Sequence, residues 1–250
     1  EGKTTAEMQD IQTYRDARWD FTGEIADGTC QIWQMPEGGG YPVLATLTGY
    51  TPVQLQGRGT PEDPYLISNP PELGAIAHYP PSAHYRLVAS IDLVGIRWSV
   101  AVIPSLQGSF DGNGLTISNL TITGVSFIGL FGGLGSGAEA KNLRVADVNI
   151  TGSGSYVGAL VGWNGGGVDN CYSSGTVRGS GSWYYAGVGG LAGSNYGSIT
   201  ASYSTGAVRG TKNVGGLVGL NSGTVIQCYS TGAVSGGENV GGLVGENGYG

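Results

Sequence analysis

Charged residues, cysteine and long apolar runs are all scarce in this chain. Only 12% of its 250 residues are charged, and 11 Lys and Arg against 18 Asp and Glu give a net charge of −7. Binding to nucleic acid requires a Lys/Arg-rich face that neutralises phosphates, so this composition argues against a nucleic-acid partner. No stretch of about 18 apolar residues occurs, and we expect no membrane span. Three cysteines cannot form a complete set of disulfides.

Glycine, in contrast, is abundant. The chain has 49 glycines, and 40% of its residues are nevertheless hydrophobic. There is no G-X-Y period, which excludes collagen, and the apolar content is too high for a disordered linker. Glycine adopts positive φ at little cost, so the composition favours many short strands joined by tight turns.

A phrase repeats along the second half of the chain. Leu160, Leu191, Leu217 and Leu243 stand in GALVG, GGLAG, GGLVG and GGLVG, at spacings of 31, 26 and 26 residues. We interpret the longer spacing as one 26-residue unit with an insertion, GSGSWYYAG at 179–187. A fixed period of this length with strand-like phrases predicts an all-β fold, a right-handed parallel β-solenoid (β-helix) whose coils have about 26 residues.

Aligning the earlier, more divergent phrases to this frame gives columns of equivalent residues. An inner column comprises Leu120, Leu143, Cys171, Ser202 and Cys228. Three residues earlier lies a second apolar column of Ile117, Ala140, Val168, Ile199 and Val225. Because side chains of a strand alternate with period 2, a bend must separate the two columns. We predict a partial asparagine ladder at that corner, formed by the column of Asn119, Asn142, Asn170, Ala201 and Gln227.

The next column should face solvent. It contains Thr121, Arg144, Tyr172, Tyr203 and Tyr229. Its three tyrosines either stack on one another and stiffen the sheet, or form a platform on which sugars stack. In this frame Cys171 and Cys228 lie two coils apart, roughly 9.6 Å, so they should be free thiols.

The rest of the chain predicts three further parts before the solenoid of residues 111–250. Residues 61–110 form a cap, with a short helix from Pro70 or Pro71 towards His78 that Asn69 or Ser68 caps. Residues 47–60 are a linker. Residues 1–46 form a separate segment that begins with a helix. That helix starts at a capping box of Thr4 and Glu7, and the aromatic residues after it include Trp19, Phe21 and Trp33.

These motifs resemble a known family. GGLVGxNxGTVxxCYSTGxV is similar to the GLUG repeat of bacterial extracellular proteins, and GSFDGNGLTISNLTI resembles the segment that precedes such repeats. Residues 1–46 resemble the piece that closes a GLUG array, although here that piece comes first. The resemblance implies a secreted or cell-surface β-solenoid and no single activity.

The order of these pieces suggests self-association. If the segment of residues 1–46 completes the last coil of a neighbour, the chain is a subunit of an extracellular filament or surface fibre assembled head to tail. The alternative is that it is an excerpt of a longer tandem protein. The expected interface comprises Thr4, Glu7, Trp19, Phe21, Trp33, Leu243, Val244, Asn247 and Tyr249.

The sequence offers little support for catalysis. Asp147 and Asp169 are in different columns, and Arg144, Arg178 and Arg209 have no carboxylates beside them of the kind a lyase would use. We therefore expect no enzyme, cofactor or metal, and rank a polysaccharide-degrading enzyme below the other functions. His78 and His84 bracket a Pro-Pro loop and are expected to be structural.

The insertion at 179–187 is the best binding candidate. Its Trp183, Tyr184 and Tyr185 could stack on sugars, pack on a neighbouring subunit, or fold back onto their own coil. With the tyrosine column, they support the alternative to a filament, which is a cell-surface module that adheres to or binds glycans.

Overall fold

The computed structural model describes residues 33–34, 43–44, 53–183 and 186–248. The chain divides into two compact units, residues 1–52 and 53–250. In the first unit, β1 (Trp33–Gln34) pairs antiparallel with β2 (Val43–Leu44). The predicted capping-box helix at Thr4 and Glu7, together with Trp19 and Phe21, lies outside the described residues.

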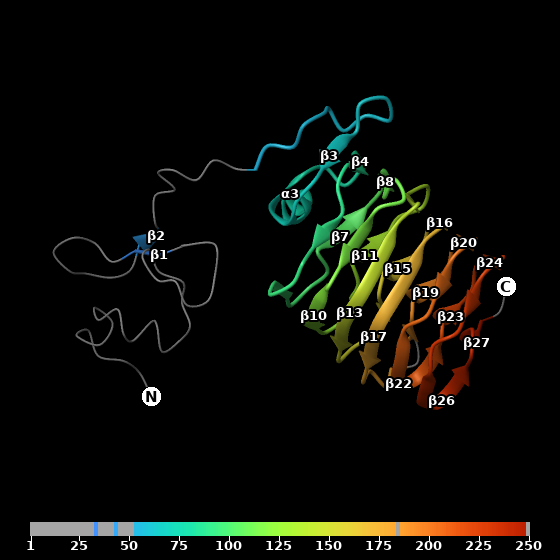
Figure 1. Cartoon of the computed structure of the whole chain (residues 1–250). Coiled ribbons are helices and arrows are strands. Elements are labelled where there is room, and N and C mark those ends of the chain that lie inside the picture. Colours follow the sequence, from blue (N-terminus) through green and yellow to red (C-terminus); the bar gives the residue numbers. More distant parts are fainter. Residues whose placement is uncertain (1–32, 35–42, 45–52, 184–185, 249–250) are drawn as a thin grey trace, which may run out of the picture. The chain divides into compact units, whose positions relative to one another are not determined.

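The second unit is a parallel β-solenoid whose strands form three sheets (Figure 1). Sheet 1 has seven strands: β3 (Tyr65–Ile67), β4 (His84–Leu87), β8 (Ser109–Asp111), β12 (Glu139–Lys141), β16 (Gly167–Asp169), β20 (Ser198–Thr200) and β24 (Thr224–Ile226). Sheet 3 has six strands: β7 (Ile103–Leu106), β11 (Phe131–Leu134), β15 (Val161–Asn164), β19 (Ala192–Asn195), β23 (Val218–Asn221) and β27 (Val244–Asn247).

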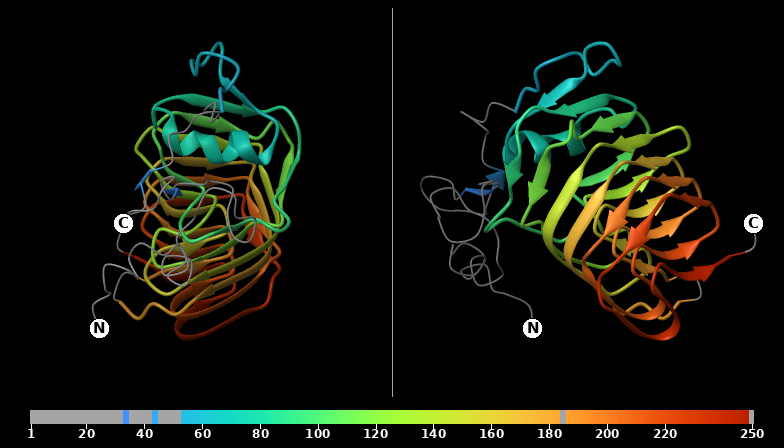
Figure 2. Two further views of the ribbon diagram at one scale, coloured as in Figure 1. Left: turned by 90° about the vertical axis from the view of Figure 1, so that its left-hand side faces the viewer. Right: turned by 45° about the vertical axis from the view of Figure 1, so that its right-hand side comes forward.

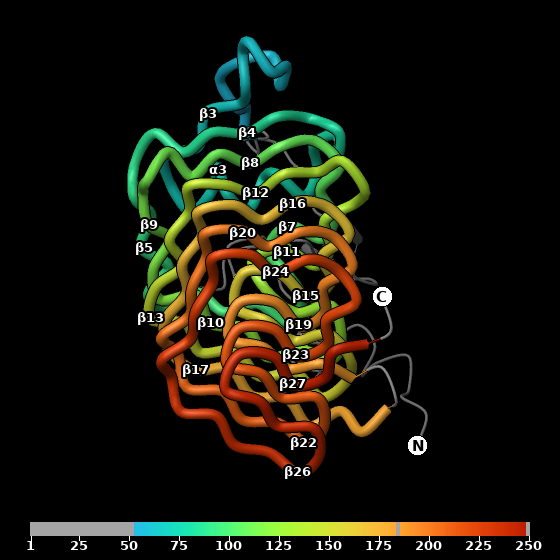
Figure 3. Tube along the Cα trace, turned by 90° about the vertical axis from the view of Figure 1, so that its right-hand side faces the viewer, coloured from blue at the N-terminus to red at the C-terminus, as the bar shows by residue number. Residues whose placement is uncertain are grey.

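Sheet 2 is the largest and follows a corner of the coil. Its twelve strands are β5 (Ile91–Asp92), β6 (Arg97–Trp98), β9 (Thr116–Ser118), β10 (Thr121–Gly124), β13 (Arg144–Gly152), β14 (Val157–Gly158), β17 (Tyr172–Gly179), β18 (Val188–Gly189), β21 (Tyr203–Ser204), β22 (Ala207–Gly215), β25 (Tyr229–Ser230) and β26 (Val234–Gly241). Each regular coil runs from sheet 1 through sheet 2 to sheet 3. Viewed from the C-terminal side of the solenoid, this path is counter-clockwise towards the viewer, which makes the coil right-handed, as predicted (Figure 3).

A short helix covers one end of the stack. Helix α3 (Pro70–Ala75) continues into the 3₁₀ turn η1 (Ile76–His78), and both lie across the first coil (Figure 2). The Asn69 side chain accepts a hydrogen bond of 3.0 Å from the backbone N–H of Glu72, which confirms the predicted N-cap. Leu73 and Ile76 are buried against the core, so the apolar end of the stack is shielded here.

The backbone register confirms the repeat. The backbone N–H of Leu160 donates to the carbonyl of Leu191, that of Leu191 to Leu217, and that of Leu217 to Leu243, at 2.9 to 3.0 Å. The insertion also lies where the spacing predicts it. Gly179 pairs with Gly210 and Val188 with Val214, so the additional residues fall between β17 and β18.

The glycines of GGLVG allow two sheets to approach at backbone distance. A Cβ atom on Gly219, the last glycine of one phrase, would lie 2.3 Å from the backbone nitrogen of Val188 in sheet 2. The equivalent Gly193 would place its Cβ 2.4 Å from the nitrogen of Val157. Real Cβ atoms do not come this close to backbone, so only glycine fits at these two positions.

The predicted columns are correct from the coil of Leu143 onwards and wrong in the coil before it. Arg144 pairs with Thr116 rather than with Thr121, and Ala140 pairs with Phe110 rather than with Ile117. Leu115 therefore takes the place predicted for Leu120. The sequence LTISNLTI, residues 115–122, repeats its own pattern after five residues, and the earlier copy is the one in register.

The corner before the inner column exists, and its asparagine ladder is shorter than predicted. Asn142 and Asn170 have φ of 53° and 50°, and Nδ2 of Asn170 donates to Oδ1 of Asn142 at 2.9 Å. Ala201 and Gln227 adopt the same left-handed conformation. Asn119 belongs instead to a second corner, opposite Asp147, where both residues also have positive φ.

A second asparagine ladder, which the sequence analysis did not predict, lies in the core. Nδ2 of Asn164 donates to Oδ1 of Asn195 at 2.7 Å, and Asn195 donates likewise to Asn221 at 2.7 Å. Asn221 continues the chain to Asn247 at 2.8 Å. The first two of these side chains are fully buried, and mutual hydrogen bonds satisfy them in the way buried amides require.

The cysteines behave as predicted. Cys171 and Cys228 are free and stand in one column, separated by Ser202. Burial raises the pKa of the Cys171 thiol to about 12. Cys30 lies outside the described residues.

Candidate functional surfaces

Three tyrosines form a continuous ladder on the outer face of sheet 2. Tyr172 pairs in register with Tyr203, and Tyr203 with Tyr229. The ring centroids are 4.7 Å apart in both pairs, and the planes of the second pair are nearly parallel. The neighbouring residues Ser173 and Ser204 are buried, so the tyrosine side chains point outward, as predicted. The ladder presents one face of Tyr229, whose side chain is half exposed.

The insertion presents one described aromatic side chain. Trp183 is 75% exposed, the largest exposed fraction of any large hydrophobic residue in the described part of the chain. It does not fold back onto its coil. Tyr184 and Tyr185 lie outside the described residues.

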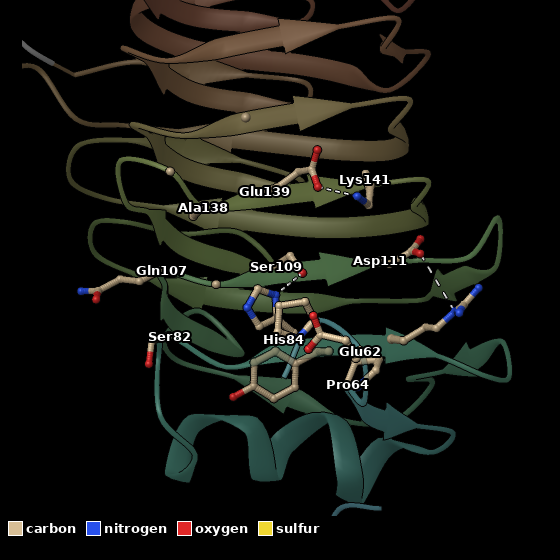
Figure 4. A pocket seen from close by; sticks show the side chains of 16 residues that line it. Glu62, Pro64, Ser82, His84, Gln107, Ser109, Asp111, Ala138, Glu139 and Lys141 are labelled. Carbon is tan, nitrogen blue, oxygen red and sulfur yellow. Dashed lines mark hydrogen bonds and ion pairs between the residues drawn. The ribbon is translucent and has the colours of Figure 1, made fainter. Parts of the chain in front are cut away.

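A polar groove of about 670 Å³ lies on the outer face of sheet 1, and most of its lining residues belong to the cap segment of residues 61–110 (Figure 4). Its floor is the start of β4, β8 and β12, where His84, Ser109 and Glu139 are in register. The loop at Pro61–Pro64 forms one wall. No sequence motif marks this groove, because its lining comes from loops of several coils and from strand positions at which polar residues alternate in the ordinary way.

Ion pairs and one close hydrogen bond organise the groove. Nδ1 of His84 lies 2.8 Å from Oγ of Ser109, and Figure 4 shows the two side chains pointing towards each other. Arg86 pairs with Asp111 at 4.0 Å. The pKa of Lys141 is raised, mainly by its hydrogen bond with Glu139. The negative charges of Glu139, Asp111 and Asp169 raise it further.

The groove has some elements of catalytic chemistry. A serine activated by histidine also requires a group that orients the imidazole and donors for an oxyanion. In the described residues, Nε2 of His84 makes no hydrogen bond, and the backbone of Ser109 is engaged in the ladder between β4 and β12. The arrangement therefore suits binding of a polar ligand better than acyl transfer.

Three of the four predicted assembly residues that the structure describes lie on the last coil. Leu243 is 36% exposed, whereas Leu217, Leu191 and Leu160 in the same column are fully buried. Val244 is half-buried, and Asn247 accepts the last hydrogen bond of the buried ladder. Trp33 stands in β1 of the other unit, and Tyr249 lies outside the described residues.

These sheets and their register define a parallel β-solenoid protein. The chain contains three GLUG motifs: the family model "The GLUG motif" matches residues 153–178, 184–209 and 210–235. None of the helices in the described ranges is long and apolar enough to cross a membrane.

Two similar proteins share about half of the chain. Halomucin from Haloquadratum walsbyi is 39% identical over 142 residues, which are 50% of this chain and 2% of halomucin. A protein described as a Gly-rich membrane protein from Evansella cellulosilytica is 36% identical over 127 residues, which are 46% of this chain and 15% of that protein.

A solved structure shares the fold. A Bacteroides ovatus protein described as a candidate immunoglobulin A1 protease matches with a TM-score of 0.62 and 25% identity, over 77% of this chain and 64% of that one. The chain thus spans less than two thirds of each of these three proteins. A β-solenoid with GLUG repeats and relatives of this kind fits an extracellular structural or adhesion role.

Proposed function

We propose that the chain is an extracellular structural protein whose solenoid is extended head to tail by a second copy. The observation that carries this proposal is the apolar surface of the last described coil. Val240 is 46% exposed and Leu243 is 36% exposed, although Val214 and Leu217, one coil earlier, are fully buried. A further coil in register would bury the last pair as well.

The unpaired backbone edge of the last described coil also supports head-to-tail extension. β24, β26 and β27 pair on one side only in the described part of the chain. A strand edge of this kind is a template for further pairing. In the proposal, residues 1–46 of a neighbour supply the next strands, because that segment resembles the closing piece of a GLUG array. The interface is heterologous and does not close, so it produces a filament.

Size-exclusion chromatography with light scattering on residues 1–250 tests the proposal. We expect polymers whose size grows with concentration. Leu243→Asp should yield monomers, because it buries a charge at the contact. Val125→Asp, at a side chain that is 65% exposed on a corner of the solenoid, is the matched control and should leave the polymers intact.

Removing residues 1–46 should also yield monomers. A monomeric chain of residues 1–250 would contradict head-to-tail assembly, and so would polymers that persist without that segment. If the chain is monomeric, the result favours the alternative that further coils of a longer polypeptide extend the stack.

A second candidate function is glycan binding at the cell surface, which the exposed Trp183 and the stacked tyrosines favour. Aromatic rings present flat apolar faces that stack on sugars. A glycan array should give signals that Trp183→Ala or Tyr229→Ala removes and that Tyr196→Ala, at an aromatic residue in the turn between β19 and β20, leaves unchanged. An array without signals would exclude this candidate.

That the chain is not an enzyme stays a prediction. The name of the Bacteroides ovatus relative is a weak pointer to proteolysis, and the His84–Ser109 contact is the one place in the groove where it would act. Labelling with a fluorophosphonate tests this point, since a reactive serine would be labelled and Ser109→Ala would remove the label.

A further inference from the structure

The cations of the solenoid fall into two groups. Four of those in the described residues form ion pairs within 4.0 Å: Arg58 with Asp63, Arg86 with Asp111, Lys141 with Glu139, and Lys212 with Glu238. The other four have no ion-pair partner in that part of the chain, and all are exposed on strands of sheet 2: Arg97, Arg144, Arg178 and Arg209.

The four unpaired arginines all point outward from sheet 2. Arg97, Arg178 and Arg209 lie on one side of the corner at Asp147 and Gly175, and Arg144 lies on the other. Ile122, Ile150, Val177 and Val208 form a buried column of sheet 2, so the residues next to them along each strand point outward. Arg178 and Arg209 follow Val177 and Val208 directly. Arg144 precedes the buried Val145 and pairs in register with Tyr172.

Arg178 and Arg209 are directly opposite each other in adjacent coils. Their backbones are therefore about 4.8 Å apart, and like charges at this separation repel. No described carboxylate lies between them. In a chain with a net charge of −7, such a pair is a local excess of positive charge that an anion could bridge.

We propose that the outer face of sheet 2 binds an acidic polysaccharide, with Arg178 and Arg209 as a clamp for its carboxylate or sulfate groups. Planar guanidinium groups hold such oxyanions through paired hydrogen bonds. Tyr172 and Tyr203 lie six residues before Arg178 and Arg209 in the same coils, across the corner at Asp147 and Gly175. The separation is at most about 20 Å, so one extended chain that follows the corner can reach both. The small residues Thr176 and Ala207 between them leave the face open.

The ligand class follows from this combination. Stacked tyrosines suit sugar rings, and the arginines suit acidic groups attached to them. Nucleic acid fits less well, because it would meet only this one small basic area on an acidic protein. The inference rests on the glycan-binding candidate function and adds the charge of the ligand.

Calorimetric titration of residues 1–250 tests the proposal, with polygalacturonate as the carboxylate probe, dextran sulfate as the sulfate probe and dextran as the neutral control. We expect at least one acidic polymer to bind and dextran to bind at least tenfold more weakly. Arg178→Gln/Arg209→Gln should weaken acidic binding by roughly 10- to 100-fold. Arg178→Gln alone should also weaken it, whereas Arg58→Gln, which removes one charge at a residue outside sheet 2 and outside the groove, should leave binding within about twofold of the unchanged chain.

Thermal unfolding without polysaccharide provides a second measurement. Because the two arginines repel each other, Arg178→Gln should leave the midpoint unchanged or raise it. A lower midpoint would mean that the arginines stabilise the fold, which overturns the clamp. Equal losses of binding in Arg178→Gln and Arg58→Gln, or equal binding of dextran, would overturn it too while leaving glycan binding in place. If no polysaccharide binds, both the clamp and the glycan-binding function fail.

Discussion

The rings of Tyr203 and Tyr229 are stacked, with planes 8° apart and centroids 4.7 Å apart. That separation is the spacing of adjacent β-strands, about 4.8 Å, because the two residues occupy the same position in consecutive coils. Tyr203 makes a second contact of 4.7 Å with Tyr172. It is therefore the middle member of the ladder and touches a ring on each side.

Replacing the middle tyrosine should destabilise the solenoid. Tyr203→Ala removes two aromatic contacts, each worth about 0.5–1.5 kcal/mol, so we expect a loss of about 1–3 kcal/mol in the free energy of unfolding. Tyr229→Ala removes one contact and should cost about half as much. Chemical denaturation measures both. Equal effects of the two substitutions would contradict the ladder as a source of stability.

The close approach of the two sheets should make the chain reject an added methyl group at Gly219. A Cβ on Gly219 would meet the backbone nitrogen of Val188 at 2.3 Å, whereas a Cβ on Gly74 in helix α3 would have nothing within 4 Å. We expect Gly219→Ala to cost at least about 2 kcal/mol, and Gly74→Ala to be neutral or to stabilise the chain by up to about 1 kcal/mol. Thermal unfolding decides this, and a tolerated Gly219→Ala would refute the close approach of the two sheets.

The buried asparagine ladder should depend on every member. Asn195→Ala removes the acceptor for Asn164 and the donor to Asn221. Leaving buried polar groups unpaired costs about 1–3 kcal/mol each, so we expect a loss of about 2–5 kcal/mol. Asn149→Ala, at an exposed asparagine of β13, is the control and should be close to neutral. A similar effect of both substitutions would contradict the ladder.

The sequence predicted the fold better than it predicted the surfaces. The recurring leucines gave the coil and its register, because identical phrases stacked in register place like residues over like. The first coil was aligned five residues too late, since LTISNLTI fits the pattern twice and only the turn at Asn113 and Gly114, both with positive φ, selects between the two.

The buried asparagine ladder, the groove and the arginine pair depend on contacts between different coils, which the sequence of a single repeat does not reveal. Asn164 in GALVGWN resembles a turn residue, and only the neighbouring Asn195 makes its burial possible. The groove around His84 and Ser109 is assembled from loops of different coils. Arg178 and Arg209 were recognised as basic residues without acidic neighbours, but their significance comes from comparison with the paired cations elsewhere.

Alkaline pH should weaken the fold. Burial raises the pKa of Cys171 from 9.0 to about 12, and raises that of Tyr85 from 10.0 to about 12. Above pH 9 the unfolded chain loses these protons before the folded chain does, so stability falls as the pH rises from about 9 towards 12. Cys171→Ser replaces the thiol by the side chain that Ser202 has in the same column. It should reduce the slope of the free energy of unfolding against pH between pH 9 and 10. An unchanged slope would show that the thiol is not protected.

Cross-linking of adjacent coils tests the stacked register most directly. Thr176, which is half-buried, and Ala207, which is exposed, are partners in adjacent coils of sheet 2, whereas Thr176 and Ala233 are two coils apart. In a chain whose three native cysteines are replaced by serine, Thr176→Cys/Ala207→Cys should form an intramolecular disulfide under mild oxidation. Thr176→Cys/Ala233→Cys, at roughly 9.6 Å, should retain two free thiols. Free thiols in the first pair and a disulfide in the second would contradict the stacking of 26-residue coils.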